Sequence, residues 1–170
     1  MVHLLKYGRV RTLSRPLGTL LVSALPPQQR FDLITAVPMH WLRRWQRGFN
    51  QSELLAAEVA RRFGLKPARL VGRKKSTPPQ AGMGRSQRRS NVAGVFDLRK
   101  GADVRGKRIL LIDDVLTTGA TVSSCAGVLK RAGAKYVAVL TLARADRRPT
   151  DAVASFEAIS ISESGSVIDA

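Results

Sequence analysis

One stretch of thirteen residues, from Ile109 to Thr121, constrains the fold of this chain more than any other. It begins with four apolar residues, continues with the adjacent carboxylates Asp113 and Asp114, and passes through small polar residues into a helical pattern. A short apolar run of this kind indicates a buried strand. Open α/β sheets bind their ligands at the carboxyl ends of such strands. We therefore expect a binding site at Asp113 and Asp114, where this strand is predicted to end.

The composition of this stretch suits a sugar that carries a phosphate. Two neighbouring carboxylates accept hydrogen bonds from paired sugar hydroxyls. The loop after them leads into a helix N-terminus, where unpaired N–H groups and the helix dipole favour an anion. Its threonine hydroxyls add donors, and Gly119 lets the backbone approach a phosphate closely. An unrelated pair of surface acids is the alternative for Asp113 and Asp114 taken by themselves.

The surrounding chain alternates between strand and helix patterns. Strands are predicted over residues 32–37, 92–98, 108–112 and 136–142. Helices are predicted over residues 3–25, from Asn50 or Ser52 as the cap to Phe63, and over 121–131. Pro16 is expected to split the first helix in two. This order predicts an α/β fold with a mostly parallel sheet flanked by helices.

Residues 72–91 are rich in Gly, Pro, Ser, Arg and Lys. A long polar segment inside a compact domain is usually a functional lid or a disordered loop. We therefore place a flexible lid near residues 72–96 of a domain that spans residues 1–144. Residues 145–170 are treated as a C-terminal tail of uncertain structure, with some strand character over 154–161.

The stretch from Ile109 to Thr121 resembles the signature for 5-phosphoribosyl-1-pyrophosphate (PRPP) of type I phosphoribosyltransferases. Further blocks resemble the ComF/GntX family of phosphoribosyltransferase-like proteins. These blocks are His3-Leu4-Leu5-Lys6-Tyr7-Gly8, Val37-Pro38, Arg47-Gly48-Phe49-Asn50-Gln51 with Leu54 and Leu55, and the spaced residues Gln80, Arg88, Asn91, Gly94 and Phe96. The resemblance covers residues 3–144 and implies a type I phosphoribosyltransferase-like fold.

The resemblance also implies a role for each part of the site. Asp113 and Asp114 would hold the ribose 2′ and 3′ hydroxyls and would be the catalytic pair, favouring a cationic ribose. The 5′-phosphate would be held by Thr117, Thr118, Gly119, Ala120 and Thr121. The candidates for binding pyrophosphate are Arg43, Arg44 and Arg47 after the first strand, and Arg88 in the lid. A solvated basic loop is the alternative reading of these arginines.

The implied reaction transfers a 5-phosphoribosyl group from PRPP to an unidentified nitrogen acceptor and releases pyrophosphate. Mg²⁺ is the implied cofactor, held mainly through PRPP with no metal site of the protein's own. Arginines and Mg²⁺ would stabilise the leaving pyrophosphate. A sensor that binds a phosphosugar or nucleotide without turning it over is a weaker possibility, and activity as an enzyme stays open.

The charge of the chain suggests a second function. Lys and Arg number 29 against 12 acids, for a net charge of +17, whereas residues 145–170 hold two arginines against five acids. Such a surface attracts polyanions, and the ComF resemblance implies a link to DNA uptake in competent bacteria. The alternative function is therefore a non-catalytic accessory protein that binds single-stranded DNA, with Trp41 and Trp45 able to stack on bases. A generally arginine-rich proteome explains the same charge without a partner.

Other features narrow the class of protein. Cys125 is the single cysteine, so neither an internal disulfide nor a cysteine-rich zinc site can form, and we expect it in the core. His3 and His40 have no partners at metal-ligand spacing. No apolar run reaches the ~18 residues of a membrane span, and no secretory signal is recognised, so we expect a cytoplasmic protein.

The ComF/GntX resemblance also bears on the ends of the chain and on its assembly. Members of that family often begin with a zinc-binding cysteine module, whose cysteines this chain does not contain. We expect either that the module is absent or that the chain is a shortened reading. A homodimer stays open.

Overall fold

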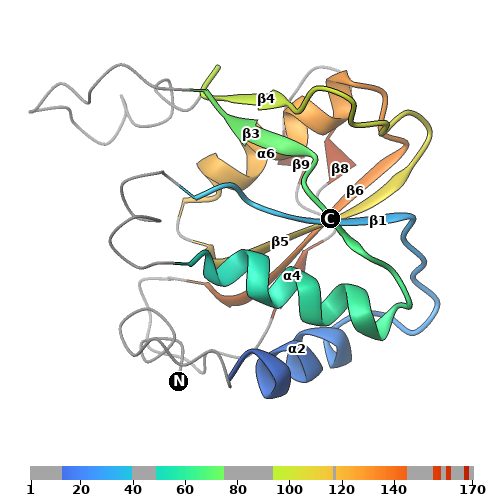
Figure 1. Ribbon diagram of the computed structural model, residues 1–170, viewed down its shortest axis with the longest axis vertical. Coiled ribbons are helices and arrows are strands. Elements are labelled where there is room, and N and C mark those ends of the chain that lie inside the picture. The colour runs from blue at the N-terminus through green and yellow to red at the C-terminus, as the bar shows by residue number, and fades with distance from the viewer. Residues whose placement is uncertain are drawn as a thin grey trace, which may run out of the picture.

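The computed structural model describes residues 13–39, 49–74, 94–116, 118–144, 155–157, 160–161 and 167–168. A five-stranded sheet in the order β2-β1-β5-β6-β7 forms its centre (Figure 1). The strands of this sheet are β1 (Leu33–Ala36), β2 (Pro67–Ala68), β5 (Arg108–Leu116), β6 (Tyr136–Arg144) and β7 (Ser155–Glu157). The first four strands in that order pair in parallel, and β7 pairs antiparallel with β6. The predicted α/β class with a mostly parallel sheet is thus confirmed.

Three helices and two strand pairs complete the described fold. The helices are α2 (Ser14–Ser23), α4 (Gln51–Arg62) and α6 (Ala120–Arg131). The pairs are β3 (Val71–Arg73) with β4 (Phe96–Leu98), and β8 (Ser160–Ile161) with β9 (Val167–Ile168). Both pairs are antiparallel. The segment 75–93, which contains most of the predicted lid, lies outside the described residues, and β3 and β4 flank it.

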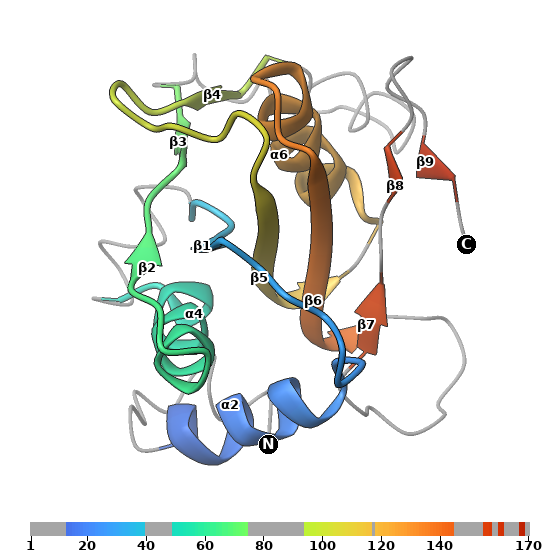
Figure 2. The ribbon, with the colours of Figure 1, turned by 90° about the vertical axis from the view of Figure 1, so that its right-hand side faces the viewer.

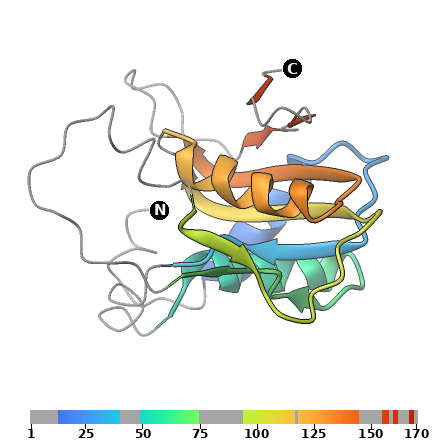
Figure 3. The same cartoon turned by 90° about the horizontal axis from the view of Figure 1, so that it is seen from above.

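Strand β5 is the centre of the core because both of its faces are covered. Ile109 and Leu111 pack with α6 and the β3–β4 pair in one apolar cluster. Leu110 and Ile112 pack with α2 and α4 in a second cluster on the other face. The layers are visible in Figures 2 and 3, where α6 covers one face of the sheet and α2 and α4 cover the other. A strand covered on both faces is expected to be continuously apolar, which is the pattern of this run.

Two predicted elements have different limits in the structure. The strand predicted over 108–112 continues to Leu116, so Asp113 and Asp114 lie within β5 and not after it. The reason is the long neighbour β6, which pairs with β5 as far as Leu116. Of the helix predicted over 3–25, residues 3–12 lie outside the described residues, and α2 begins at Ser14 with Pro16 in its first turn. Proline is tolerated there because the first N–H groups of a helix have no intrahelical acceptor.

Part of the segment assigned to a tail joins the central sheet. In β7, residues 155–157 pair with Thr141, Leu140 and Val139 of β6. Strand character was expected over 154–161, and both β7 and β8 lie in that range.

Among the residues that the structure describes, no helix combines the length and the apolar character that a membrane crossing needs.

Helices α2 and α4 approach each other closely at a glycine. Gly18 of α2 is buried, and a Cβ at this position would lie 2.9 Å from Glu58 Cβ and closer still to Cγ. Glu58 is held in place by Arg61, whose Nε and Nη2 donate to it over 3.2 and 2.7 Å. Arg62 adds an ion pair at 3.4 Å. A side chain at residue 18 would therefore displace a carboxylate that has fixed partners.

We expect Gly18→Ala to destabilise the protein by about 1–3 kcal/mol, because overpacking outweighs the better helix propensity of alanine. Gly127→Ala in α6 is the matched control, since a Cβ there would meet only the far end of the Arg131 side chain, at 3.1 Å. The control should be neutral or up to about 1 kcal/mol more stable. Urea unfolding measures both variants, and a Gly18→Ala protein as stable as wild type would contradict this packing.

Candidate functional site

The two acids of β5 lie where that strand extends beyond β1. The pairing of β1 with β5 ends at Ala36 and Ile112, and the N–H of Val37 donates to the Ile112 carbonyl over 2.9 Å. From Asp113 onward, β6 is the paired neighbour of β5 in the described sheet. Asp113 and Asp114 are both half-buried. They are therefore at the carboxyl end of the parallel sheet, the end at which α/β proteins bind ligands.

Asp113 is held by donors from two different elements. Ser52 of α4 donates its hydroxyl to Asp113 Oδ1 over 3.1 Å, and the backbone N–H of Asp114 donates to the same oxygen over 3.0 Å. Desolvation and then the neighbouring charge of Asp114 raise the pKa of Asp113 to about 7, although both hydrogen bonds oppose the rise. At neutral pH this carboxyl is therefore poised between its charged and neutral forms.

The side chain of Asp114 bonds to the backbone of its own strand. Its Oδ1 accepts a hydrogen bond of 2.9 Å from the N–H of Val115. The structure thus brings together the two acids that were predicted to bind sugar hydroxyls, at the predicted end of the sheet. It places them inside a strand, where the backbone is extended and regular, and not in a loop.

The segment after β5 forms the predicted helix N-terminus. Thr117 lies outside the described residues, and Thr118, Gly119, Ala120 and Thr121 lead into α6. Gly119 is the cap residue, with a left-handed backbone (φ +71°) and no capping side chain. The first turn of α6 carries no acid, so its N–H groups and the positive end of the helix dipole would favour an anion such as a phosphate.

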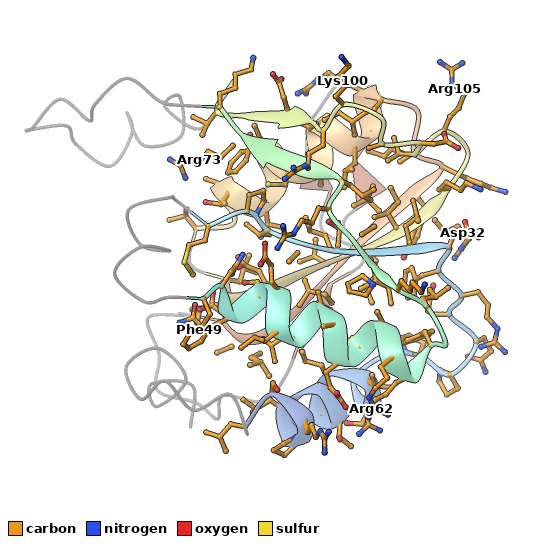
Figure 4. The ribbon with its side chains drawn as sticks, in the orientation of Figure 1. Asp32, Phe49, Arg62, Arg73, Lys100 and Arg105 are labelled. Atoms are coloured by element: carbon orange, nitrogen blue, oxygen red, sulfur yellow. The ribbon has the colours of Figure 1, made fainter. Side chains whose placement is uncertain are left out.

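Helix α4 reaches the same end of the sheet as α6. Asn50 caps α4, accepting from the Ser52 N–H over 3.1 Å, and its Nδ2 donates to the Val37 carbonyl over 3.2 Å. In Figure 4, Phe49 is labelled at this end of α4. The predicted pyrophosphate candidates all lie outside the described residues; they are Arg43, Arg44, Arg47 and Arg88.

Cys125 belongs to the core, as predicted. It is fully buried in α6, and burial together with the charge of Asp113 raises the pKa of its thiol.

Within the described ranges, no group of three or more His, Cys, Asp or Glu side chains is placed to hold a metal ion.

A cavity of about 960 Å³ lies between α4, the β1–β2 edge of the sheet, and β3. Four cationic side chains line it: Arg69, Arg73, Lys74 and Arg99. Arg69 pairs with Glu53 at 3.3 Å, Lys74 with Asp97 at 3.0 Å, and Arg73 lies 5.6 Å from the ring centroid of Phe96. Neither Asp113 nor Asp114 is part of this lining.

Sequence reasoning missed both this cationic cavity and the contact between Ser52 and Asp113. Cations on both sides of the 75–93 segment were a signal for the cavity. For Ser52, 61 residues from Asp113, the sequence held no signal beyond its suitability as a cap.

Comparisons with known proteins place this geometry in a family. The model for the phosphoribosyl transferase domain matches residues 50–164. The DNA utilization protein YhgH of Escherichia coli K12 is 33% identical over 151 residues, which cover 85% of this chain and 66% of that protein. Competence protein F of Haemophilus influenzae is 30% identical over 153 residues, covering 85% and 67% of the two chains. This chain therefore spans about two thirds of the length of these relatives.

Solved structures share the fold at low sequence identity. The allosteric regulatory enzyme of purine biosynthesis superposes with a TM-score of 0.58 at 20% identity, covering 86% of this chain and 29% of that one. Adenine phosphoribosyltransferase from Thermoanaerobacter pseudethanolicus superposes with a TM-score of 0.53 at 21% identity, covering 76% and 66%. With these neighbours and the domain match, the chain belongs to the phosphoribosyltransferase family, as a ComF-type member with the type I fold.

Proposed function

We propose that this protein binds PRPP and transfers its 5-phosphoribosyl group to a nitrogen acceptor, with release of pyrophosphate. The observation that carries the proposal is that Asp113 and Asp114 lie at the same end of the sheet as the N-terminus of α6, whose cap residue is Gly119. This arrangement provides acceptors for sugar hydroxyls beside donors for a phosphate. The match to the phosphoribosyl transferase domain supports it.

In this proposal each group has a distinct task. Asp113 and Asp114 accept hydrogen bonds from the 2′ and 3′ hydroxyls, while the turn from Thr117 to Thr121 receives the 5′-phosphate. The acceptor nitrogen forms a bond to C1 as the bond from C1 to the pyrophosphate oxygen breaks, and pyrophosphate leaves with the electron pair. Two carboxylates near the ribose favour the positive charge that develops on the ring.

The leaving group needs positive partners. We propose Arg43, Arg44 and Arg47, with Arg88 from the lid, as its ligands, on the family resemblance of those segments. Mg²⁺ fits the same chemistry when it is carried in on the phosphate oxygens, because Mg²⁺ commonly keeps its waters and uses substrate phosphates with one or two carboxylates. When bound there, the ion neutralises charge on the leaving pyrophosphate.

A second candidate function is a non-catalytic role in which the same scaffold binds single-stranded DNA. The relatives whose names are DNA utilization protein and competence protein F point in this direction. The cavity lined by four cationic side chains supports it, because phosphates along a strand pair with such groups. The chain has 29 basic and 12 acidic residues, and this excess of positive charge favours the same partner.

The double variant Asp113→Asn/Asp114→Asn tests the PRPP site. Hydrogen bonds to charged groups contribute roughly 1.5–3 kcal/mol each, so losing two should weaken PRPP binding by at least about 100-fold. Calorimetric titration of PRPP with Mg²⁺ measures the loss. Asp103→Asn is the control, because this exposed acid bonds only locally, to the Arg105 N–H at 3.3 Å. If a folded wild type gives no binding heat, the proposal fails.

The affinity for PRPP should also depend on pH. Because the pKa of Asp113 is raised to about 7, this carboxyl takes up a proton as the pH falls through neutrality and loses acceptor capacity. Affinity should therefore be highest above about pH 8 and decline toward about pH 6. The control ligand is inorganic pyrophosphate, which would not contact Asp113. An equal decline for both ligands would show that Asp113 is not the titrating group.

The DNA-binding role is tested by the salt dependence of binding. Replacing Arg69, Arg73 and Arg99 with alanine should lower the slope of log affinity against log salt by roughly 2, at about 0.7 per phosphate contact on a single strand. A fluorescent oligothymidylate measures the slope by anisotropy. The charge-matched control replaces the exposed residues Arg30, Arg131 and Lys135 with alanine. Equal slopes for the two triple variants would reject the cavity as the DNA site.

A further inference from the structure

The N-terminus of α4 is bonded to two neighbouring strands of the sheet, β1 and β5. Through the side chain of Asn50 it is bonded to Val37, just past the end of β1. Through the hydroxyl of Ser52 it is bonded to Asp113 on β5, over 3.1 Å. Asn50 and Ser52 are each only 3% exposed, so solvent competes little for these bonds. The start of α4 therefore fixes the spacing between the end of β1 and the carboxyl of Asp113.

Asn50 and Ser52 have different roles at the start of α4: one caps the helix and the other bonds to β5. Both asparagine and serine are good helix caps. Here the Asn50 Oδ1 accepts from the backbone N–H of Ser52, so Asn50 is the cap. The hydroxyl of Ser52 is consequently not needed for capping and extends across to Asp113. The Ser52 hydroxyl therefore bonds to the neighbouring strand β5 and not to its own helix.

The bond from Ser52 acts on the orientation and the charge of Asp113. Ser52 Oγ and the Asp114 N–H both donate to Oδ1, so the carboxyl is fixed from α4 and from its own strand. Such donors stabilise the charged form of a carboxyl, and here they oppose the effect of burial and of the Asp114 charge. The other groups around it include Thr141, its register partner on β6, and Cys125 of α6, whose thiol Arg73 also influences.

We propose that Ser52 is a positioning residue for the sugar site, which orients Asp113 and favours its charged form so that it can accept a ribose hydroxyl. This role rests on the proposed PRPP-binding function. Ser52 itself need not touch PRPP, because its effect passes through Asp113. A purely structural serine, which only joins α4 to β5, would change stability but would leave the titration of Asp113 unaltered.

The test follows the titration of Asp113 in the ligand-free protein and the affinity for PRPP in the same set of variants. Carboxyl carbon chemical shifts, recorded against pH by NMR, give the Asp113 midpoint. In Ser52→Ala the midpoint should rise by about 0.5–1 pH unit, since a donor to the charged form is lost. PRPP affinity near pH 7 should then fall by about 2–5-fold and should recover toward the wild-type value at about pH 9.

Two further variants make the result specific. Ser52→Cys keeps the size of the side chain but donates more weakly, so its midpoint and affinity should lie between those of wild type and Ser52→Ala. It also serves as the test protein if Ser52→Ala does not fold. Ser23→Ala is the matched control, because it removes a serine hydroxyl bond of 2.8 Å, to the Leu20 carbonyl, on the exposed side of α2. It should change neither the midpoint nor the affinity.

The outcomes separate this role from the function on which it rests. A wild-type protein that binds no PRPP overturns the proposed function and this role with it. A wild type that binds PRPP, together with an unshifted Asp113 midpoint in Ser52→Ala, overturns the role of Ser52 alone. A loss of affinity that is the same at every pH also overturns it, since that result describes a structural serine.

Discussion

The buried position of β5 is the constraint on which the rest of the structure depends. Four consecutive apolar residues, from Ile109 to Ile112, are fully buried between α6 on one face and the α2–α4 pair on the other. A charge within that run would have to be desolvated without a partner, which is strongly unfavourable. The acids therefore follow the apolar run directly, at Asp113 and Asp114. There β5 has passed its paired neighbour β1 and continues along β6 alone.

At that boundary, opposing effects act on the pKa of Asp113. Asp113 is buried enough for desolvation to raise its pKa to about 7, yet it receives donors from α4 and from its own strand. A fully solvated acid would hold its charge but would compete with water for every sugar hydroxyl. A fully buried acid would be neutral at physiological pH. The half-buried position of Asp113 thus limits competition from water and still allows its carboxyl to be charged when a ligand binds.

The sequence predicted those parts of the protein that depend on local pattern. The strand beginning at Arg108 was predicted from its continuous apolar run, and the helix ending at Arg131 from the helical pattern that follows the small polar residues. The extension of β5 to Leu116 was not predicted, because polar residues hide a strand that is maintained by pairing with β6. The contact of Ser52 with Asp113 was also beyond prediction, since it depends on the packing of a helix against a strand far away in sequence. The roles of Asp113, Asp114 and the turn that follows them in binding PRPP remain predictions.

The bond between Asn50 and Val37 has a consequence for how the start of α4 is held in place. It ties Val37, which precedes the segment 38–49, to Asn50, which follows it, through a single side chain. The entropy of closing a loop grows only slowly with its length, by about 0.6 kcal/mol for each doubling. The placement of α4 and of the Asp113 carboxyl should therefore depend little on the length of the segment between these two residues.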